Sequence, residues 1–181
     1  DRTIFENAQI DTQGIETVEG ETFRWVGSYE GSMAQAITHE THLNVFEHFE
    51  PKVPEHGRNP IVTFCANLHP AIQLSVLDQS KPVRFSILDS MNLWIDIAHD
   101  TLLEAMKRVD IVVINDGEAS MLAGQENVVA AAKAVQHMAS IPTLIVKRGE
   151  HGVIALHGDD TIAMPSYPCP EVMDPTGCGD T

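Results

Sequence analysis

Short apolar runs that alternate with helical patterns from Ile61 onward constrain the fold of this chain more than any other feature. The runs predict buried strands over residues 61–65, 83–88, 111–114 and 143–146. The segments between them carry apolar residues at helical spacing over residues 72–77, 102–109 and 128–138. Strands and helices in this order are typical of βα units, so we expect an α/β fold built on an open, mostly parallel sheet.

The sequence on either side of these units has a different pattern of polar and apolar residues. Residues 1–49 are polar and punctuated by glycines, which predicts short strands and hairpins. Near the other end, two apolar runs flank residues 157–160 and predict a β-hairpin over residues 153–164. We therefore expect a small β domain over residues 1–49 and an α/β core over residues 50–181.

The charge balance excludes some classes of partner. The 181 residues include 11 Lys and Arg against 26 Asp and Glu, and the formal net charge is −15. Such an acidic protein is disfavoured as a general nucleic-acid binder, and its overall charge would not hold it on an anionic membrane. No apolar run approaches the roughly 18 residues of a membrane span. We expect neither a nucleic acid nor a membrane as partner, and any anionic ligand must be bound by local groups.

The cysteines and the two ends of the sequence indicate the expected cellular compartment and whether the chain is a fragment. Cys65, Cys169 and Cys178 are odd in number and widely spaced, which fits neither a disulfide framework nor a zinc ribbon. No basic start followed by an apolar stretch predicts a signal peptide, so we expect a cytoplasmic protein. The sequence opens at Asp1 and stops at Thr181 inside a motif described below. We therefore expect both ends to be cut and the fragment to be inactive by itself.

Polar residues follow every predicted strand of the core. Open α/β sheets bind ligands beyond the carboxyl ends of their strands, which makes these residues candidates for a site. They include Asn67, Asp89, Asn92, Asn115, Glu118, Lys147 and Arg148. The same residue types also cap helices and satisfy free amides in any such fold, so each of them taken alone favours a structural role.

The most specific motif runs from Asp174 to Thr181 and reads Asp-Pro-Thr-Gly-Cys-Gly-Asp-Thr. If a helix begins here, the backbone amides of Gly177, Cys178 and Gly179 would converge on an anion at its positive end. Asp180 then has two interpretations. It either complements the helix dipole, which is worth about 0.3–1 kcal/mol, or it accepts a proton from a nucleophile that faces the anion.

This motif resembles the second signature of the PfkB, or ribokinase-like, family of sugar and nucleoside kinases. The resemblance implies that Gly177, Cys178 and Gly179 form the anion hole and that Asp180 is the catalytic base. Asn115-Asp116-Gly117-Glu118 is similar to the Asn-x-x-Glu motif of the same family. That similarity implies that Asn115 and Glu118 hold Mg²⁺ through water and help to place the phosphate.

Further segments resemble the family in the same order along the chain. Residues 147–152 are similar to a loop with paired glycines beside the nucleotide, and residues 89–92 resemble a strand-end Asp-x-Asn element near the triphosphate. The nucleotide or phosphate contacts that the resemblance implies are Asn92, Asn115, Lys147, Arg148, Gly149, Gly152 and Thr176. For Lys147 and Arg148, a solvated strand end is the competing interpretation.

The stretch around Phe23 and Trp25 resembles a strand of the β lid that closes over the substrate in this family. Period-two geometry puts Phe23, Trp25 and Tyr29 on one face of a strand. Such an aromatic face either packs in a core or stacks on a sugar or nucleoside, and a lid strand does both. The resemblance also implies a homodimer through the lid as one option.

Taken together, the resemblance implies an enzyme that transfers the γ-phosphate of ATP to a hydroxyl of a small sugar or sugar-like substrate with the help of Mg²⁺. Two alternatives within the same fold remain open: a nucleoside kinase of the adenosine type, and a nucleotide-binding regulatory protein without activity. The first glycine signature of the family and its early strands are absent, so the sequence does not identify the acceptor. Cys178 stands where the family most often has Ala, and a thiol at a helix N-terminus is expected to be the most reactive one.

A hypothesis from another class is a metal-binding module in the first domain. His39, His42 and His48 lie close together in sequence with Glu40 and Glu47. Their spacing is not the zinc-protease pattern, and residues three apart on a strand face opposite ways. The spacing therefore disfavours this hypothesis.

Overall fold

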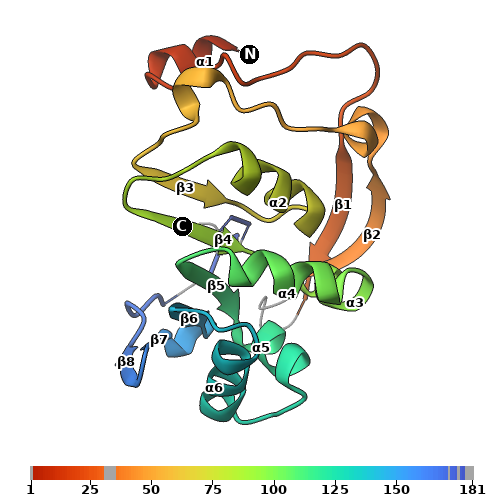
Figure 1. The fold of residues 1–181 in the computed structure, drawn as a ribbon. Helices are drawn as coiled ribbons and strands as arrows, with labels where there is room; N and C mark the ends of the chain where they lie inside the picture. The colour runs from red at the N-terminus through yellow and green to blue at the C-terminus, as the bar shows by residue number, and fades with distance from the viewer. Residues whose placement is uncertain (1, 31–35, 171, 175, 178–181) are drawn as a thin grey trace. The chain divides into compact units, whose positions relative to one another are not determined.

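The computed structural model describes residues 2–30, 36–170, 172–174 and 176–177 of the chain. The chain divides into two compact units, Asp1–Gly57 and Arg58–Thr181. Each unit is described by itself below, with the element labels of Figure 1. The expected domain boundary after residue 49 stays a prediction. None of the described helices is both long and apolar enough to cross a membrane.

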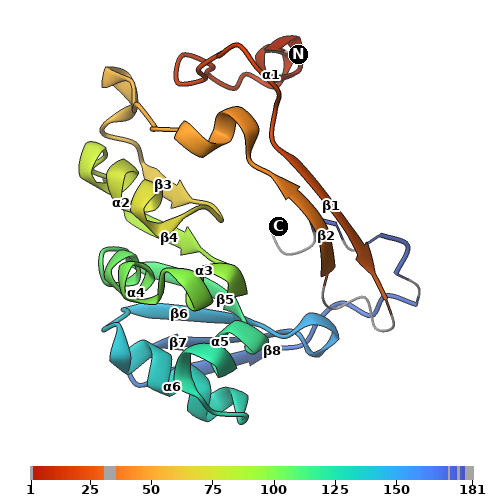
Figure 2. The ribbon, with the colours of Figure 1, turned by 90° about the vertical axis from the view of Figure 1, so that its right-hand side faces the viewer.

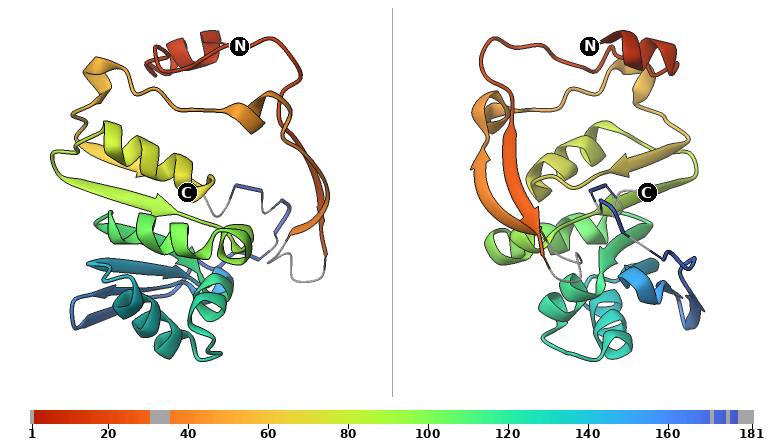
Figure 3. Two further views of the ribbon diagram at one scale, coloured as in Figure 1. Left: turned by 45° about the vertical axis from the view of Figure 1, so that its right-hand side comes forward. Right: turned by 180° about the vertical axis from the view of Figure 1, so that it is seen from behind.

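The first unit is a two-stranded antiparallel ribbon with short helical segments before and after it (Figure 3). Its elements in chain order are α1 (Arg2–Asn7), β1 (Arg24–Tyr29), β2 (Ala36–His42) and the 3₁₀ turns η1 (Asn44–His48) and η2 (Glu55–Gly57). The expected hairpin is present, whereas α1 was predicted as extended chain. That helix buries none of its residues, so no amphipathic pattern marks it in the sequence.

The ribbon contains a β-bulge that fixes where its side chains lie. Val26 pairs with Glu40, but the next residue, Gly27, pairs with Thr38, which leaves His39 as the extra residue on β2. The indole of Trp25 lies over Gly27, where a Cβ would overlap the ring. Glycine at this position therefore lets the tryptophan lie flat along its own strand.

The second unit is the α/β core. Its elements in chain order are β3 (Val62–Cys65), α2 (Pro70–Gln79), β4 (Phe85–Asp89), α3 (Asn92–Ile97), α4 (His99–Lys107), β5 (Ile111–Asn115), α5 (Asp116–Ala123), α6 (Val128–Met138), β6 (Thr143–Lys147), η3 (Gly149–His151), β7 (Val153–His157) and β8 (Asp160–Met164). The six strands form one sheet in the order β3-β4-β5-β6-β7-β8, as Figure 2 shows. The first three strand pairs are parallel and the last two are antiparallel.

This architecture confirms the predicted α/β fold, its four parallel strands and the terminal hairpin. The predicted helices are present as α2, α4 and α6, while the short helices α3, two residues after β4, and α5, directly after β5, were not predicted. Both begin at residues that the sequence marks as strand-end polar groups. The sequence pattern identified the polar residues but not the helical turns that they start.

The hydrophobic core lies on one face of the parallel strands. Along β5 and β6 the residues alternate between fully buried and half-buried, and the buried set of these two strands comprises Val112, Ile114, Leu144 and Val146. They belong to one cluster with Leu102 and Met106 of α4 and Val135 of α6. Burying each of these side chains contributes about 1.5–3 kcal/mol before conformational entropy is counted. This packing fixes the strands whose carboxyl ends carry the candidate site.

Candidate functional site

Three neighbouring parallel strands end in residues with charged or amide side chains. These are Asp89 on β4, Asn115 on β5 and Lys147 on β6, and Asn115 pairs directly with Lys147 in the sheet. The Lys147 Nζ lies 3.6 Å from Oδ1 of Asp89. This ion pair reaches across β5 from the strand on one side of it to the strand on the other. The sheet topology therefore brings together residues that are far apart in the sequence.

Asn115 and Glu118 bind one another in a capping box at the start of α5. The Glu118 amide donates to Asn115 Oδ1 at 2.8 Å, and the Asn115 amide donates to Glu118 Oε2 at 2.9 Å. In addition, Asn115 Nδ2 donates to Glu118 Oε1 at 2.7 Å. Each carboxylate oxygen accepts one of these bonds and keeps a lone pair for a further donor or cation. The structure thus brings together the two residues predicted to hold magnesium.

The electrostatics of Glu118 link it to the ion pair. Burial is the largest cause of a shift that raises the pKa of Glu118 from 4.5 to about 7. The Asn115 backbone amide and the positive charge of Lys147 oppose this shift, whereas the negative charges of Asp89 and Asp116 add to it. The charges of Asp89 and Lys147 therefore both act on the Glu118 carboxyl.

These residues fit a Mg²⁺ ion that keeps part of its water shell. Carboxylate oxygens are the ligands that this cation prefers, and it commonly takes only one or two of them from the protein, with phosphates and water as the rest. A cation beside Glu118 would also favour the charged form that burial disfavours. Among the residues that the structure describes, no group of three or more His, Cys, Asp or Glu is arranged to hold a metal by itself.

The loop after β6 is a tight turn that carries the other predicted nucleotide contacts. The Arg148 amide donates to the Gly152 carbonyl at 2.8 Å, and the Gly152 amide donates to the Gly149 carbonyl at 3.1 Å. Gly149 and Gly152 have φ angles of +52° and +84°, which favour glycine. The Nε of Arg148 is buried and has no hydrogen-bond partner in the described part of the chain. An anion at this loop would supply one.

Asn92 lies at the first residue of α3, and its side chain is exposed. Its Oδ1 accepts a hydrogen bond from the Leu93 amide at 3.1 Å. The phosphate contact predicted for Asn92 stays a prediction. In the same region, the indole of Trp94 donates to Asn67 Oδ1 at 2.8 Å, and the His69 ring packs edge-on against Trp94. This contact between α3 and the segment that joins β3 to α2 was not predicted, because it depends on how parts far apart in the sequence pack together.

Part of the terminal glycine motif is described. The Thr176 amide donates to Asp174 Oδ1 at 2.9 Å, and this bond is the largest cause that lowers the pKa of Asp174. Gly177 has a φ of +78°. Cys178, Gly179 and Asp180 lie outside the described residues, so the predicted anion hole and catalytic base stay predictions. Thr176 and Gly177 lie in a turn.

The predicted lid residues belong to the first unit. Phe23 and Trp25 are both partly exposed, and the Trp25 indole donates to Thr38 Oγ1 at 3.1 Å. Phe23 packs edge-on against Phe46 with ring centroids 5.9 Å apart. The Trp25 ring is therefore held by β2 and the Phe23 ring by η1, while part of each surface stays open. Their role toward a substrate stays a prediction.

The histidines of the ribbon do not gather. His39 bonds to Ser28 Oγ at 2.9 Å, whereas His42 lies 3.3 Å from Glu40. No metal-holding group occurs among the residues described in this unit. The ribbon therefore offers no support for a metal-binding module.

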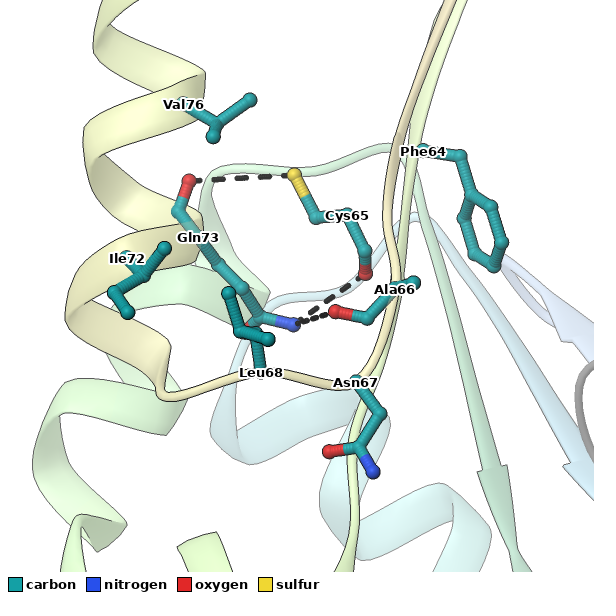
Figure 4. Close-up of a pocket in the computed structure, with 8 residues that line it drawn as sticks. All are labelled: Phe64, Cys65, Ala66, Asn67, Leu68, Ile72, Gln73 and Val76. Carbon is teal, nitrogen blue, oxygen red and sulfur yellow. Dashed lines mark hydrogen bonds between the residues drawn. The ribbon is translucent and has the colours of Figure 1, made fainter. Parts of the chain in front are cut away.

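A cavity of about 170 Å³ lies between β3 and α2 (Figure 4). Its lining residues are Phe64, Cys65, Ala66, Asn67, Leu68, Ile72, Gln73 and Val76. Burial raises the pKa of the Cys65 thiol to about 11, so this cysteine is a packing residue rather than a nucleophile. Gln73, which is buried on α2, was not singled out in the sequence. A polar residue on the buried face of a helix is the signal that could have found it.

Comparison with known proteins identifies the family. Residues 73–181 match the model of the pfkB family carbohydrate kinase. The cytidine kinase of Thermococcus kodakarensis is 29% identical to this chain over 178 residues, which cover 94% of the chain and 62% of that protein. The chain thus spans less than two thirds of the length of this relative.

Solved structures share the fold at lower identity. A nucleoside kinase of Burkholderia thailandensis in complex with inosine has a TM-score of 0.73 and 17% identity, and the match covers 98% of this chain and 57% of that one. The ribokinase of Thermotoga maritima has a TM-score of 0.67 and 16% identity, with 98% and 58% covered. These structures confirm the ribokinase-like fold. Because the family model matches more than half of the sequence, this chain belongs to the pfkB family of carbohydrate kinases.

Proposed function

We propose that the whole protein is a kinase that transfers the γ-phosphate of ATP to a hydroxyl of a small sugar or nucleoside, with Mg²⁺ as its metal. The observation that carries this proposal is the group of charged residues at the carboxyl ends of β4, β5 and β6. There the capping box of Asn115 and Glu118 lies beside the ion pair of Asp89 and Lys147. Family membership supports the same reaction.

The residues have separate tasks in this proposal. Asn115 and Glu118 would hold Mg²⁺ through water, and the metal would neutralise charge on the phosphate oxygens. Lys147 and Arg148 supply positive charge at the end of β6, where the paired-glycine loop borders the nucleotide. The backbone amides of Gly177, Cys178 and Gly179 bind oxygens of the transferring phosphate.

Asp180 is the proposed base toward the acceptor hydroxyl. A carboxylate with an ordinary pKa of about 3.9 is a weak base for an alcohol. The proton therefore moves late, as the acceptor oxygen bonds to phosphorus and becomes acidic. Phosphoryl transfer needs mainly positioning and charge stabilisation, so a weak base in the right place is sufficient.

The acceptor class has two candidates, and one observation favours a nucleoside. The Thermococcus kodakarensis relative that matches 94% of this chain is named a cytidine kinase. A sugar remains the alternative, since the family as a whole is described as carbohydrate kinases. The partly exposed Phe23 and Trp25 rings suit either acceptor, because both a nucleobase and a sugar present flat apolar faces.

The test is an acceptor panel with the whole protein. Cytidine, adenosine, inosine, ribose and fructose are each incubated with Mg²⁺ and ATP, and ADP formation and the mass of the phosphorylated product are measured. We expect one of the nucleosides to give the highest kcat/KM. Product from ribose or fructose alone would select the sugar kinase, while ATP binding without any product would support the non-catalytic regulator.

The expected homodimer through the β1–β2 ribbon can be tested alongside. Apolar side chains on β2 and just after it are exposed, namely Ile37 and Leu43. We propose that a second copy covers them in the whole protein. Sedimentation equilibrium of the native protein and of an Ile37→Glu variant would show a dimer only for the native protein.

A further inference from the structure

Gln73 connects the carboxyl ends of two strands to a helix. Its side chain is buried on α2, with 2% of the residue exposed. The Nε2 donates to the carbonyl oxygens of Ala66 and Asp89, both at 2.9 Å, and to that of Cys65 at 3.4 Å. Figure 4 shows the bonds to Cys65 and Ala66. A single amide group therefore ties the end of β3 to the end of β4.

The chemistry of this junction requires a donor with two hydrogens. Backbone carbonyls in a buried place cost free energy unless they are paired, and three of them face the same nitrogen. An amide NH₂ supplies two hydrogens, whereas Leu, Met or an ionised Glu supplies none. The Oε1 of Gln73 is buried without a partner in the described part of the chain. The bonds from Nε2 to the carbonyls therefore set the orientation of the side-chain amide.

The connection continues from the backbone of Asp89 to its side chain. The Asp89 carbonyl accepts from Gln73, and its carboxylate lies 3.6 Å from the Lys147 ammonium on β6. The Asp89 side chain is only 10% exposed, so little solvent screens this pair. A change in the Asp89 backbone would therefore displace the charge that Lys147 faces.

We propose that Gln73 is a positioning residue for phosphoryl transfer, which fixes the Asp89 backbone and, through its carboxylate, the Lys147 ammonium. This inference rests on the proposed function, because it assigns a task to the same group of charges. Gln73 is buried, so in this proposal it contacts neither the nucleotide nor the acceptor. It acts from the buried side of the sheet end, through its hydrogen bond to the Asp89 carbonyl and the ion pair of Asp89 with Lys147.

The test is a double-mutant cycle in the whole protein. Gln73→Met removes the donor and keeps the length of the side chain, and Lys147→Met removes the charge at the other end of the connection. The control is Gln79→Met on the same helix, whose amide donates to the Ser75 carbonyl and hydroxyl within α2. Thermal unfolding is measured first, so that kcat and KM are compared for folded protein only.

We expect Gln73→Met to lower kcat by about tenfold or more, because small displacements of positioning groups are costly, while KM for the acceptor changes less than about twofold. In the Lys147→Met background the same change should have little further effect. Gln79→Met should leave both constants within about twofold. Independent, multiplicative effects of the Gln73 and Lys147 changes would overturn the proposal, since a merely structural role predicts them.

A second measurement decides the proposal without activity. The ¹⁵N resonance of the Lys147 ammonium should move in Gln73→Met in the same direction as in Asp89→Asn, and should stay in place in Gln79→Met. An unchanged resonance in Gln73→Met overturns the positioning role even if the enzyme is active. An inactive native protein contradicts the proposed function instead, and the resonance still tests Gln73. If Gln73→Met does not fold, Gln73→Asn, which keeps a shorter amide, replaces it.

Discussion

Glu118 and Asn115 close the first turn of α5 with three hydrogen bonds between 2.7 and 2.9 Å. The same pair is a helix cap and the proposed holder of Mg²⁺. A capping box satisfies amides that would otherwise lack partners, and it also fixes the carboxylate in one orientation. The two roles are compatible, because a ligand that is already held in place loses little entropy when a cation binds. The start of α5 therefore holds the proposed Mg²⁺ ligands in place before the cation binds.

The buried carboxyl of Glu118 predicts a pH-dependent stability. Its pKa is raised from 4.5 to about 7, chiefly by burial, so the folded protein binds this proton more tightly than the unfolded chain does. The resulting stabilisation, up to about 3 kcal/mol, is fully present below pH 4.5 and is lost as the pH rises through about 7. Urea unfolding between pH 5 and 8 should show this loss in the native protein.

The variant Glu118→Gln is the control for that pH dependence. It keeps the shape of the side chain but cannot titrate, so its free energy of unfolding should change less over the same pH range. The slope against pH is the readout, since the variant also loses one acceptor for Asn115. Equal slopes for the two proteins would show that Glu118 titrates normally in the fold.

The paired-glycine loop predicts different costs at its two glycines. A Cβ at Gly152 would overlap the backbone carbonyl of Met164, whereas a Cβ at Gly149 meets nothing within 4 Å. Gly149→Ala should therefore cost only the strain of its positive φ, about 1 kcal/mol. Gly152→Ala should cost at least about 2 kcal/mol more, because β8 has to move. Chemical unfolding of both variants measures the difference, and similar costs would mean that the close approach to Met164 is absent.

The sequence was sufficient for most of the fold. Apolar runs mark all four parallel strands in the sequence, because strands such as β5 and β6 are buried on one face and half-buried on the other and carry apolar residues on both. The short helices α3 and α5 were missed, since six to eight residues carry too few turns for a helical pattern. The bulge at His39 was missed because register depends on two strands at once.

The sequence predicted only those contacts of the site whose residues lie in one short segment of the chain. Asn115 and Glu118 are three residues apart, so their pairing at a helix start follows from local rules. Asp89 and Lys147 meet only because β4 and β6 flank β5, and sheet order is a tertiary property. Gln73 was missed for the same reason, since the carbonyls that it binds belong to the ends of two strands and not to its own helix.

The three cysteines are predicted to react with an alkylating reagent at different rates, because their surroundings differ. Burial raises the pKa of Cys65 to about 11, while Cys169 is exposed. The thiolate is the reactive form, so iodoacetamide at pH 7.5 should leave Cys65 unmodified in the folded protein and modify it in urea. Cys178, which lies outside the described residues, is predicted from its motif to react fastest of the three. Peptide mass spectrometry over time gives the three rates, and equal rates for Cys65 and Cys178 would refute the prediction.

The assignment of Asp180 as the catalytic base predicts a large loss of kcat when its carboxylate is removed from the whole protein. Asp180→Asn keeps the size of the side chain and removes the proton acceptor, so kcat should fall by about 10²- to 10⁴-fold. The affinity for ATP should change less than about threefold, because the base faces the acceptor rather than the nucleotide. Asp159→Asn, in the exposed turn between β7 and β8, is the matched control and should retain native kcat. Calorimetry with ATP and steady-state kinetics separate the two effects. A variant with native kcat would exclude Asp180 as the base, whereas a lost affinity for ATP with unchanged kcat would move this residue from the acceptor to the nucleotide.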